Sequence, residues 1–156
     1  MSMQKSLLTS ITFLLGLVAI SSSVSYGLEG TKYNRISNFQ DSSCLSLNQL
    51  TNCVTNLPVD LNQIWYIEPR LDGKGKWHAV FNLGTQKCLT AAGDSISLQT
   101  CNGNLDNQAW YPEANGDGTY NLFNKGVQKC LFRNRVSTCN ASRVQQRWVI
   151  LPVREI

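Results

Sequence analysis

Few residues of this chain have the types and spacing that catalysis requires. The only histidine, His78, stands beside Trp77 in an alternating stretch that is typical of a strand. Asp60, Asp94 and Asp106 occur in turn-like contexts, where aspartates are common. No glycine-rich phosphate loop is present, and no pair of carboxylates is evident that would suit glycoside hydrolysis. We therefore expect no catalytic residues and no cofactor.

The strongest pattern is formed by cysteines, glutamines and tryptophans. Three Cys-Leu pairs recur at similar intervals, and each is followed by a second cysteine and then by a Gln-x-Trp motif. The segments "FNLGTQKCL" (81–89) and "FNKGVQKCL" (123–131) differ at two positions. We interpret the pattern as three tandem copies of one unit. The members are Cys44, Cys53, Gln63 and Trp65; Cys88, Cys101, Gln108 and Trp110; and Cys130, Cys139, Gln146 and Trp148.

Each copy is predicted to contain four short strands. In the second copy they are "WHAVFN", "KCLTAA", "SISLQT" and "QAWYPE", which are rich in β-branched and aromatic residues. Three such copies favour a closed, pseudo-threefold arrangement, because closure hides strand edges. We predict an all-β protein, a β-trefoil, with one domain over 28–156 and repeats at about 30–72, 73–116 and 117–152. The tryptophans would fill its centre, and the glutamines would tie loops to buried backbone.

The first residues, 1–27, predict a secretory signal peptide. Lys5 is followed by the apolar run 7–20 and then by small residues. The run is shorter than the roughly 20 residues of a membrane span, so we expect no transmembrane segment, although an N-terminal anchor is the alternative. Cleavage after Ser25 or after Gly27 fits equally well. Secretion favours three disulfides, and the lack of Cys-x-x-Cys argues against a metal site.

Charge is distributed unevenly along the chain. Residues 28–119 have a net charge of −3, and residues 120–156 have a net charge of +6. A positive face could attract an anionic partner, although well-solvated surface arginines are the plainer interpretation. Nucleic acid is not expected as a partner, because aromatic residues are not interleaved with the basic ones.

The repeated Cys-Leu, second cysteine and Gln-x-Trp are similar to the ricin B-type lectin family over about residues 30–152. The repeat suggests disulfides within each copy, Cys44–Cys53, Cys88–Cys101 and Cys130–Cys139, although six cysteines allow 15 connectivities. Galactose-binding members have an aspartate after Cys-Leu, an aromatic ring two residues before the second cysteine, and an asparagine before Gln-x-Trp. Here the aspartate positions hold Ser46, Thr90 and Phe132, the aromatic positions Thr51, Gln99 and Ser137, and the asparagine positions Asn62, Asn107 and Gln145.

The resemblance implies a carbohydrate-binding module whose sugar sites have lost the carboxylate and the ring. The sugar-binding candidates are Thr90, Gln99 and Asn107 in the second copy, with Ser46 and Asn62 in the first. The alternative is that all three copies are scaffold. Trp77 begins the first strand of the second copy, and we expect it at the rim of the core rather than in an exposed aromatic patch.

A looser resemblance links the chain to the non-enzymatic trefoil subunits of cytolethal distending toxin. It rests on "QIWYIEP" (63–69) and "QRWVILP" (146–152). It implies a delivery subunit that contacts a toxin enzymatic subunit or a second trefoil subunit, with Arg133, Arg135 and Arg147 as candidates for binding an anion or a partner. Our preferred prediction is a secreted, non-catalytic lectin that recognises cell-surface or extracellular glycans.

Overall fold

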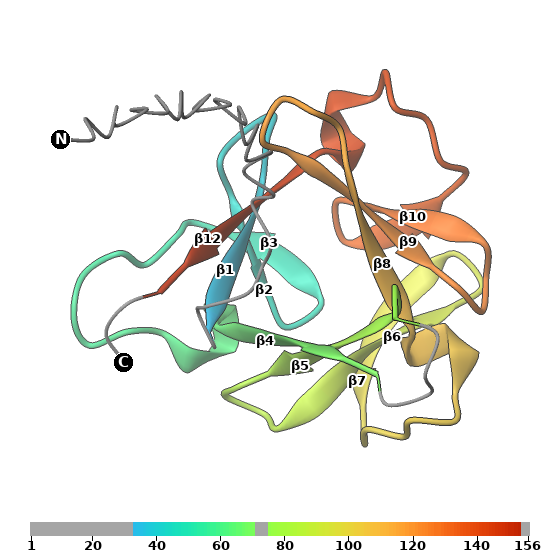
Figure 1. Ribbon diagram of the computed structural model, residues 1–156. Helices are drawn as coiled ribbons and strands as arrows, with labels where there is room; N and C mark the ends of the chain where they lie inside the picture. Colours follow the sequence, from blue (N-terminus) through green and yellow to red (C-terminus); the bar gives the residue numbers. More distant parts are fainter. Residues whose placement is uncertain (1–32, 71–74, 154–156) are drawn as a thin grey trace, which may run out of the picture.

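The computed structural model describes residues 33–70 and 75–153 (Figure 1). In this part of the chain there are twelve strands and three short 3-10 helices, which occur as three successive units with the same order of elements. The β-trefoil prediction is confirmed. The predicted signal peptide, residues 1–27, and both ends of the predicted domain lie outside the described residues. Among the described residues, no helix has the length and apolar character needed to span a bilayer.

The bounds of the elements follow the repeats. The first unit contains β1 (Asn34–Asn38), β2 (Cys44–Ser46), β3 (Gln49–Thr51), η1 (Leu61–Gln63) and β4 (Trp65–Pro69). The second contains β5 (His78–Asn82), β6 (Lys87–Ala92), β7 (Ser95–Gln99), η2 (Asp106–Gln108) and β8 (Trp110–Ala114). The third contains β9 (Tyr120–Asn124), β10 (Lys129–Phe132), β11 (Arg135–Ser137), η3 (Val144–Gln146) and β12 (Trp148–Pro152).

The first and last strands of the units close a barrel. β1 pairs with β4 and β12, β5 pairs with β4 and β8, and β9 pairs with β8 and β12, always antiparallel. The remaining strands form one hairpin in each unit, β2–β3, β6–β7 and β10–β11. Figure 1 shows these three units side by side around a common centre. Because the ring returns to its starting strand, the barrel leaves no unpaired edge.

The motif tryptophans occupy equivalent places in the core. Trp65, Trp110 and Trp148 are fully buried. Each indole Nε1 donates a hydrogen bond to the backbone carbonyl of the leucine that follows the first cysteine of the same unit. These leucines are Leu45 (2.9 Å), Leu89 (2.8 Å) and Leu131 (3.1 Å). A buried indole N–H needs such an acceptor, so the Cys-Leu and Gln-x-Trp motifs are structurally linked.

Asparagines at the ends of three barrel strands join each unit to the preceding one. Asn82 Nδ2 donates to the carbonyl of Asn62 at 2.9 Å, and Asn124 Nδ2 donates to the carbonyl of Asn107 at 2.9 Å. Asn38 makes the corresponding bond to Gln145 of the third unit at 3.0 Å. These bonds satisfy buried side-chain amides and fix the spacing between neighbouring units.

The structure corrects one detail of the strand prediction. The sequence predicts a strand that begins at Gln108, but this residue lies in η2, and the strand begins at Trp110. The backbone N–H groups of Gln108 and Ala109 bond to the carbonyls of Leu105 and Asp106, which closes a tight turn. The turn directs the glutamine amide back toward the second cysteine of its unit.

Candidate functional site

The Gln-x-Trp glutamine of each unit fixes the loop around the second cysteine. In the second unit, Gln108 Oε1 accepts from the N–H of Asn102 at 2.8 Å, and Gln108 Nε2 donates to the carbonyl of Thr100 at 3.0 Å. These two residues flank Cys101, which is bonded to Cys88. The amide therefore binds the backbone as a neighbouring strand would. Gln63 and Gln146 make the same pair of bonds around Cys53 and Cys139.

The three disulfides lie within the units. The structure joins Cys44 to Cys53, Cys88 to Cys101, and Cys130 to Cys139, and the described residues include no free cysteine. Each bond attaches the start of the central hairpin to the loop that precedes the 3-10 helix. In the second unit this loop lies between Gln99, at the end of β7, and Asn107, in η2, so the disulfide and the glutamine together define the position of the segment between these two sugar-binding candidates.

Of the three second-unit side chains at the sugar-contact positions of the family, only Gln99 and Asn107 are accessible to a ligand. We call these positions in each unit the family-type positions. Thr90 is 0% exposed, and its Oγ1 accepts from Gln108 Nε2 at 3.0 Å and donates to the carbonyl of Cys88 at 3.1 Å. The structure thus makes Thr90 a scaffold residue and corrects its candidacy as a ligand contact. Gln99 is exposed, and Asn107 is half-buried with its Oδ1 enclosed and without a partner among the described residues.

The first and third units have fewer accessible polar side chains at the family-type positions. Ser46 is only 6% exposed, so its hydroxyl is also a poor sugar contact. Asn62 is half-buried, and its backbone N–H donates to Asp60 Oδ1, which caps η1. In the third unit, Phe132 occupies the aspartate position and has no polar group. Loss of the family carboxylate therefore removes the polar centre of all three family-type positions.

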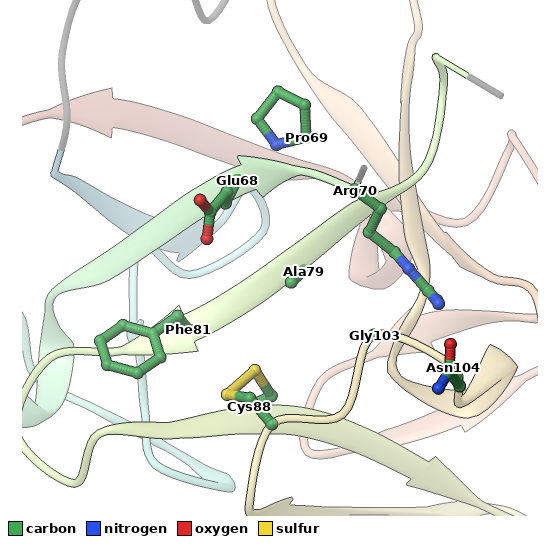
Figure 2. Close-up of a pocket in the computed structure, with 9 residues that line it drawn as sticks. Glu68, Pro69, Arg70, Ala79, Phe81, Cys88, Gly103 and Asn104 are labelled. Carbon is green, nitrogen blue, oxygen red and sulfur yellow. A yellow bond between two sulfur atoms is a disulfide. The ribbon is translucent and has the colours of Figure 1, made fainter. Parts of the chain in front are cut away.

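A cavity that the sequence did not indicate lies at the junction of the first and second units (Figure 2). It has a volume of about 570 Å³ and opens between β4, β5 and the loop after Cys101. Its lining combines apolar and polar groups. The lining residues are Glu68, Pro69, Arg70, Ala79, Phe81, Cys88, Cys101, Gly103 and Asn104. None of the sugar-binding candidates chosen from the family pattern belongs to this set.

The sequence does contain a signal for the cavity, but the signal can be recognised only when the strand register is known. Glu68 pairs with Ala79 across β4 and β5. The pairs at the same place in the β8–β9 and β12–β1 strand pairs of the barrel are Glu113 with Asn121 and Leu151 with Arg35. Ala79 is therefore the smallest residue at a position where the other units have larger ones. Space left by this small side chain contributes to the cavity.

The basic residues of the third unit are mostly engaged in ion pairs. Lys125 pairs with Asp106 at 2.8 Å, and Lys129 pairs with Asp94. Both pairs connect the basic third unit to the second unit, residues 73–116, which has three basic and three acidic residues. These pairs use two of the basic side chains of the third unit within the protein, while Arg135 and Arg143 of the same unit stay exposed.

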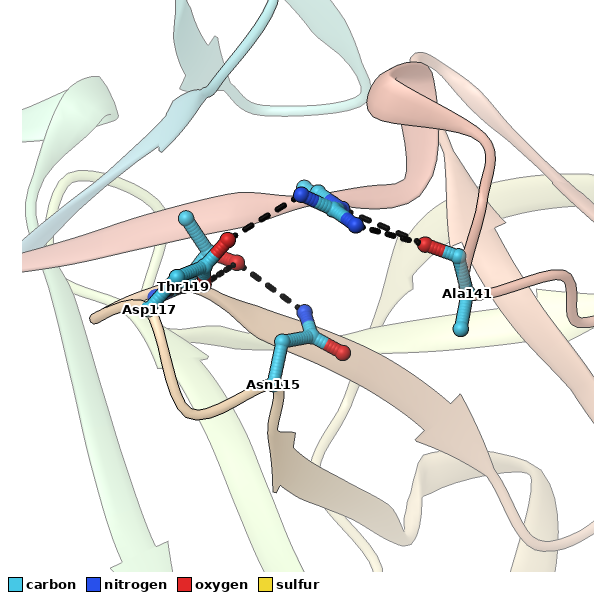
Figure 3. A network of polar contacts seen from close by, with 5 residues as sticks. Asn115, Asp117, Thr119 and Ala141 are labelled. Atoms are coloured by element: carbon cyan, nitrogen blue, oxygen red, sulfur yellow. Dashed lines mark hydrogen bonds and ion pairs between the residues drawn. The ribbon is translucent and has the colours of Figure 1, made fainter.

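Two of the three arginines proposed to bind an anion or a partner also have acidic neighbours. Arg133 pairs with Asp41 of the first unit at 3.1 Å. Arg147 Nη1 pairs with Asp117 at 3.0 Å, while its Nε and Nη2 donate to the carbonyl of Ala141 (Figure 3). Most donors of the Arg147 guanidinium are therefore occupied within the protein.

Arg135 is the most exposed of the three proposed arginines. Its guanidinium lies 5.1 Å from the centroid of the Phe132 ring, in a cation–π arrangement. Arg135 also lines a second, more polar cavity of about 340 Å³ with Lys129, Asp94 and Ser137. The pKa of Asp94 is lowered chiefly by the hydrogen bond from Lys129, and the charge of Arg135 adds to the effect without forming an ion pair.

Several carboxyl groups are held in their charged form by these contacts. The pKa of Asp41 is lowered by hydrogen bonds from Ser43, with a further contribution from Arg133. The pKa of Asp117 is lowered chiefly by hydrogen bonds from Thr119, with Arg147 adding to the effect. Burial lowers the pKa of His78, which favours the neutral imidazole in β5.

Trp77 lies at the rim of the core, as we expected. It is 8% exposed, and its ring contacts Tyr111 and Phe123 at centroid distances of 6.2 Å and 6.1 Å. The ammonium group of Lys76 lies 5.0 Å from the centroid of the Trp77 ring. The exposed aromatic patch that was the alternative does not form around Trp77.

The closed barrel, the three hairpins and the Gln-x-Trp motifs define a lectin-type β-trefoil. The family described as "Ricin-type beta-trefoil lectin domain-like" matches residues 61–148, and the chain belongs to this family. A comparison with curated proteins found no match.

Solved structures share the fold at low sequence identity. The designed threefold-symmetric protein ThreeFoil aligns with a TM-score of 0.64 and 16% identity, over 78% of this chain and 99% of that chain. The Haemophilus ducreyi cytolethal distending toxin aligns with a TM-score of 0.67 and 14% identity, over 80% of this chain and 86% of that chain. SeviL bound to asialo-GM1 saccharide aligns with a TM-score of 0.61 and 18% identity, over 79% of this chain and 98% of that chain.

Proposed function

We propose that this chain is a secreted, non-catalytic carbohydrate-binding module that recognises cell-surface or extracellular glycans. The observation that supports this function is the family match, which spans the second unit and the motifs on either side of it. SeviL has the same fold and was solved with a bound saccharide, which is a further reason to test glycans. Residues 1–27 supply the proposed export signal, and the three disulfides suit an oxidising compartment.

The second unit is the proposed place for a family-type sugar contact. Gln99 and Asn107 flank the loop that Gln108 and the Cys88–Cys101 disulfide hold in place. Two amide side chains without a carboxylate would give weak binding, because sugar hydroxyls are already well hydrated. Binding of millimolar affinity corresponds to only about 4 kcal/mol. Display of several modules on one surface would then raise the apparent affinity.

A glycan array with competition by free sugar tests this function. The protein should bind a subset of neutral glycans, and the matching free sugar should displace it. The variant Asn107→Ala should lower the signal about fivefold, the value of one neutral hydrogen bond. The control Asn56→Ala changes an exposed asparagine of the first unit and should have no effect. Absence of binding across the array for the wild-type protein would refute the function.

The second candidate is a delivery subunit like those of cytolethal distending toxin. The buried hydroxyls of Ser46 and Thr90 favour it, since they leave the family-type sugar positions incomplete. In that case the array should be silent, and the protein should co-purify with a nuclease-like chain or a second trefoil. Because Arg135 is the most exposed of the proposed arginines, Arg135→Ala should weaken such a complex more than Arg147→Ala.

A further inference from the structure

We propose that the cavity between the first and second units is a second saccharide site, which takes one neutral pyranose ring. This inference rests on the proposed glycan-binding function and adds a site outside the family-type positions. The volume of about 570 Å³ lies within the range of small-molecule sites and is large enough for a monosaccharide.

The walls of the cavity are suited to the two kinds of surface that a sugar ring presents. The Phe81 ring, the sulfurs of Cys88–Cys101 and the methyl group of Ala79 provide an apolar wall for the C–H face of the ring. In Figure 2, Ala79 lies between the side chain of Phe81 and that of Arg70. Contact between an aromatic ring and an apolar ligand face excludes water from the hydrogen bonds beside it.

Polar groups stand around this apolar wall. Glu68 extends from β4 on the side of Phe81, and Asn104 comes from the loop after Cys101 (Figure 2). Glu68 and Asn104 are both exposed, so the carboxylate and the side-chain amide are accessible to a ligand. The carboxylate can accept two hydroxyl hydrogens, and the amide can both donate and accept.

Arg70 is fixed in place by the protein before any ligand arrives. Its Nη1 donates to the carbonyl of Leu105 at 3.0 Å, and its backbone N–H donates to the carbonyl of Trp77 at 2.9 Å. Its Nε is enclosed and has no partner among the described residues. The guanidinium therefore connects β4 to the loop that carries Asn104, and the site needs little reorganisation when a ligand binds.

The charges of the cavity favour an uncharged ligand. Glu68 and Arg70 are two positions apart, so in an extended chain their side chains point to the same side. They contribute one negative and one positive group to the lining of the cavity. Their charges cancel at a distance, so neither an anion nor a cation gains a net Coulomb attraction. A polyhydroxylated neutral ring can instead accept from one group and donate to the other.

The internal symmetry of the fold shows which residues make this junction distinct. The Glu68–Ala79 pair corresponds to Glu113–Asn121 between β8 and β9 and to Leu151–Arg35 between β12 and β1. Only the first of these three described pairs combines a carboxylate with a side chain as small as alanine. The third unit already accommodates an asparagine, Asn121, at this position, so the barrel should still fold with the substitution Ala79→Asn.

The test is an NMR titration of 15N-labelled protein with methyl glycosides of galactose, glucose, mannose and N-acetylglucosamine. At least one glycoside should shift the amide signals of Ala79, Phe81, Gly103 and Asn104. Glu68→Gln should raise the Kd about tenfold, because it removes the charged acceptor. Ala79→Asn should abolish the shifts. The matched controls Glu113→Gln and Ala92→Asn change an exposed glutamate and an exposed alanine outside the lining and should bind as the wild type does.

The outcomes separate this inference from the proposed function. Shifts confined to Gln99, Asn107 and their neighbours, with no response to Ala79→Asn, would overturn the cavity site and leave the glycan-binding function standing. Preferential binding of methyl glucuronide or sialic acid in the cavity would overturn the neutral ligand class. The inference would also be overturned if the wild-type protein binds the array but none of the four glycosides shifts the amide signals of the cavity residues. A silent array would refute the proposed function itself.

Discussion

Replacement of the motif glutamines by alanine is expected to lower stability to different extents in the three units. Gln108 makes three side-chain hydrogen bonds, to Asn102 N, Thr100 O and Thr90 Oγ1. Gln63 also makes three, and its third partner is Thr51 Oγ1 at 3.0 Å. The bonds of Gln146 go to the backbone of Asn140 and Thr138. Phe132 stands where a hydroxyl would be needed to match Thr90.

The expected magnitudes follow from these bonds. A net contribution of about 1 kcal/mol for each bond gives losses of about 3 kcal/mol for Gln108→Ala and Gln63→Ala. The loss for Gln146→Ala is about 2 kcal/mol on the same basis. The aliphatic part of the side chain is equally buried in all three units, so its contribution cancels when the variants are compared. The difference of about 1 kcal/mol corresponds to roughly 4 °C in Tm for a domain of this size.

Urea unfolding followed by tryptophan fluorescence measures these differences, because each motif tryptophan is buried next to its glutamine. Gln49→Ala is the control, since Gln49 is exposed in β3 and should change stability by less than about 0.5 kcal/mol. The additional substitution Thr90→Val should cost less in the Gln108→Ala background than in the wild type, because the two side chains share a bond. Equal losses for all three glutamines, or a loss for Gln108→Ala no larger than that of the control, would refute the reasoning.

The remaining predictions concern backbone packing and acid stability. Gly126→Ala should destabilise the fold by about 1–3 kcal/mol, because its Cβ would lie 2.5 Å from the backbone nitrogen of Asn107. Gly103→Ala, whose Cβ would meet nothing within 4 Å, should be nearly neutral in the same urea titration; a neutral Gly126→Ala would show that the contact can relax. The lowered pKa of Asp117 means that its contribution to stability is present at neutral pH and is lost as pH falls below about 4, through the folded-state pKa. Asp117→Asn should therefore lower Tm at pH 6 and have little effect at pH 2, and a constant difference between these pH values would contradict this assignment.

The sequence predicted the architecture because the information for it is local and repeated. Each unit has its own Cys-Leu, second cysteine and Gln-x-Trp, and the bonds from Trp110 to Leu89 and from Gln108 to Thr100 stay within that unit. The same within-unit contacts form in each of the three copies, so a sequence with three repeats folds into three similar units around one axis. The within-unit disulfides have the same local origin.

The candidate site was less predictable, because the chemistry of a side chain depends on where its neighbours fold. Thr90 was a reasonable sugar contact by its position in the motif, but its hydroxyl is enclosed by Gln108 and the core. The basic third unit suggested an open positive face, but Lys125 and Lys129 meet Asp106 and Asp94 of the preceding unit. Residue type alone does not reveal such pairing.

The sequence by itself determined that this chain is a triplicated β-trefoil with three motif tryptophans, because hydrophobic pattern and repeated motifs act over short distances. The tertiary structure alone decided where a cavity would form. Glu68, Ala79 and Asn104 belong to β4, β5 and the loop after Cys101, and barrel closure and strand register bring them together. Cavity shape depends on the side chains that face one another across units, and that arrangement exists only once the ring of strands has closed.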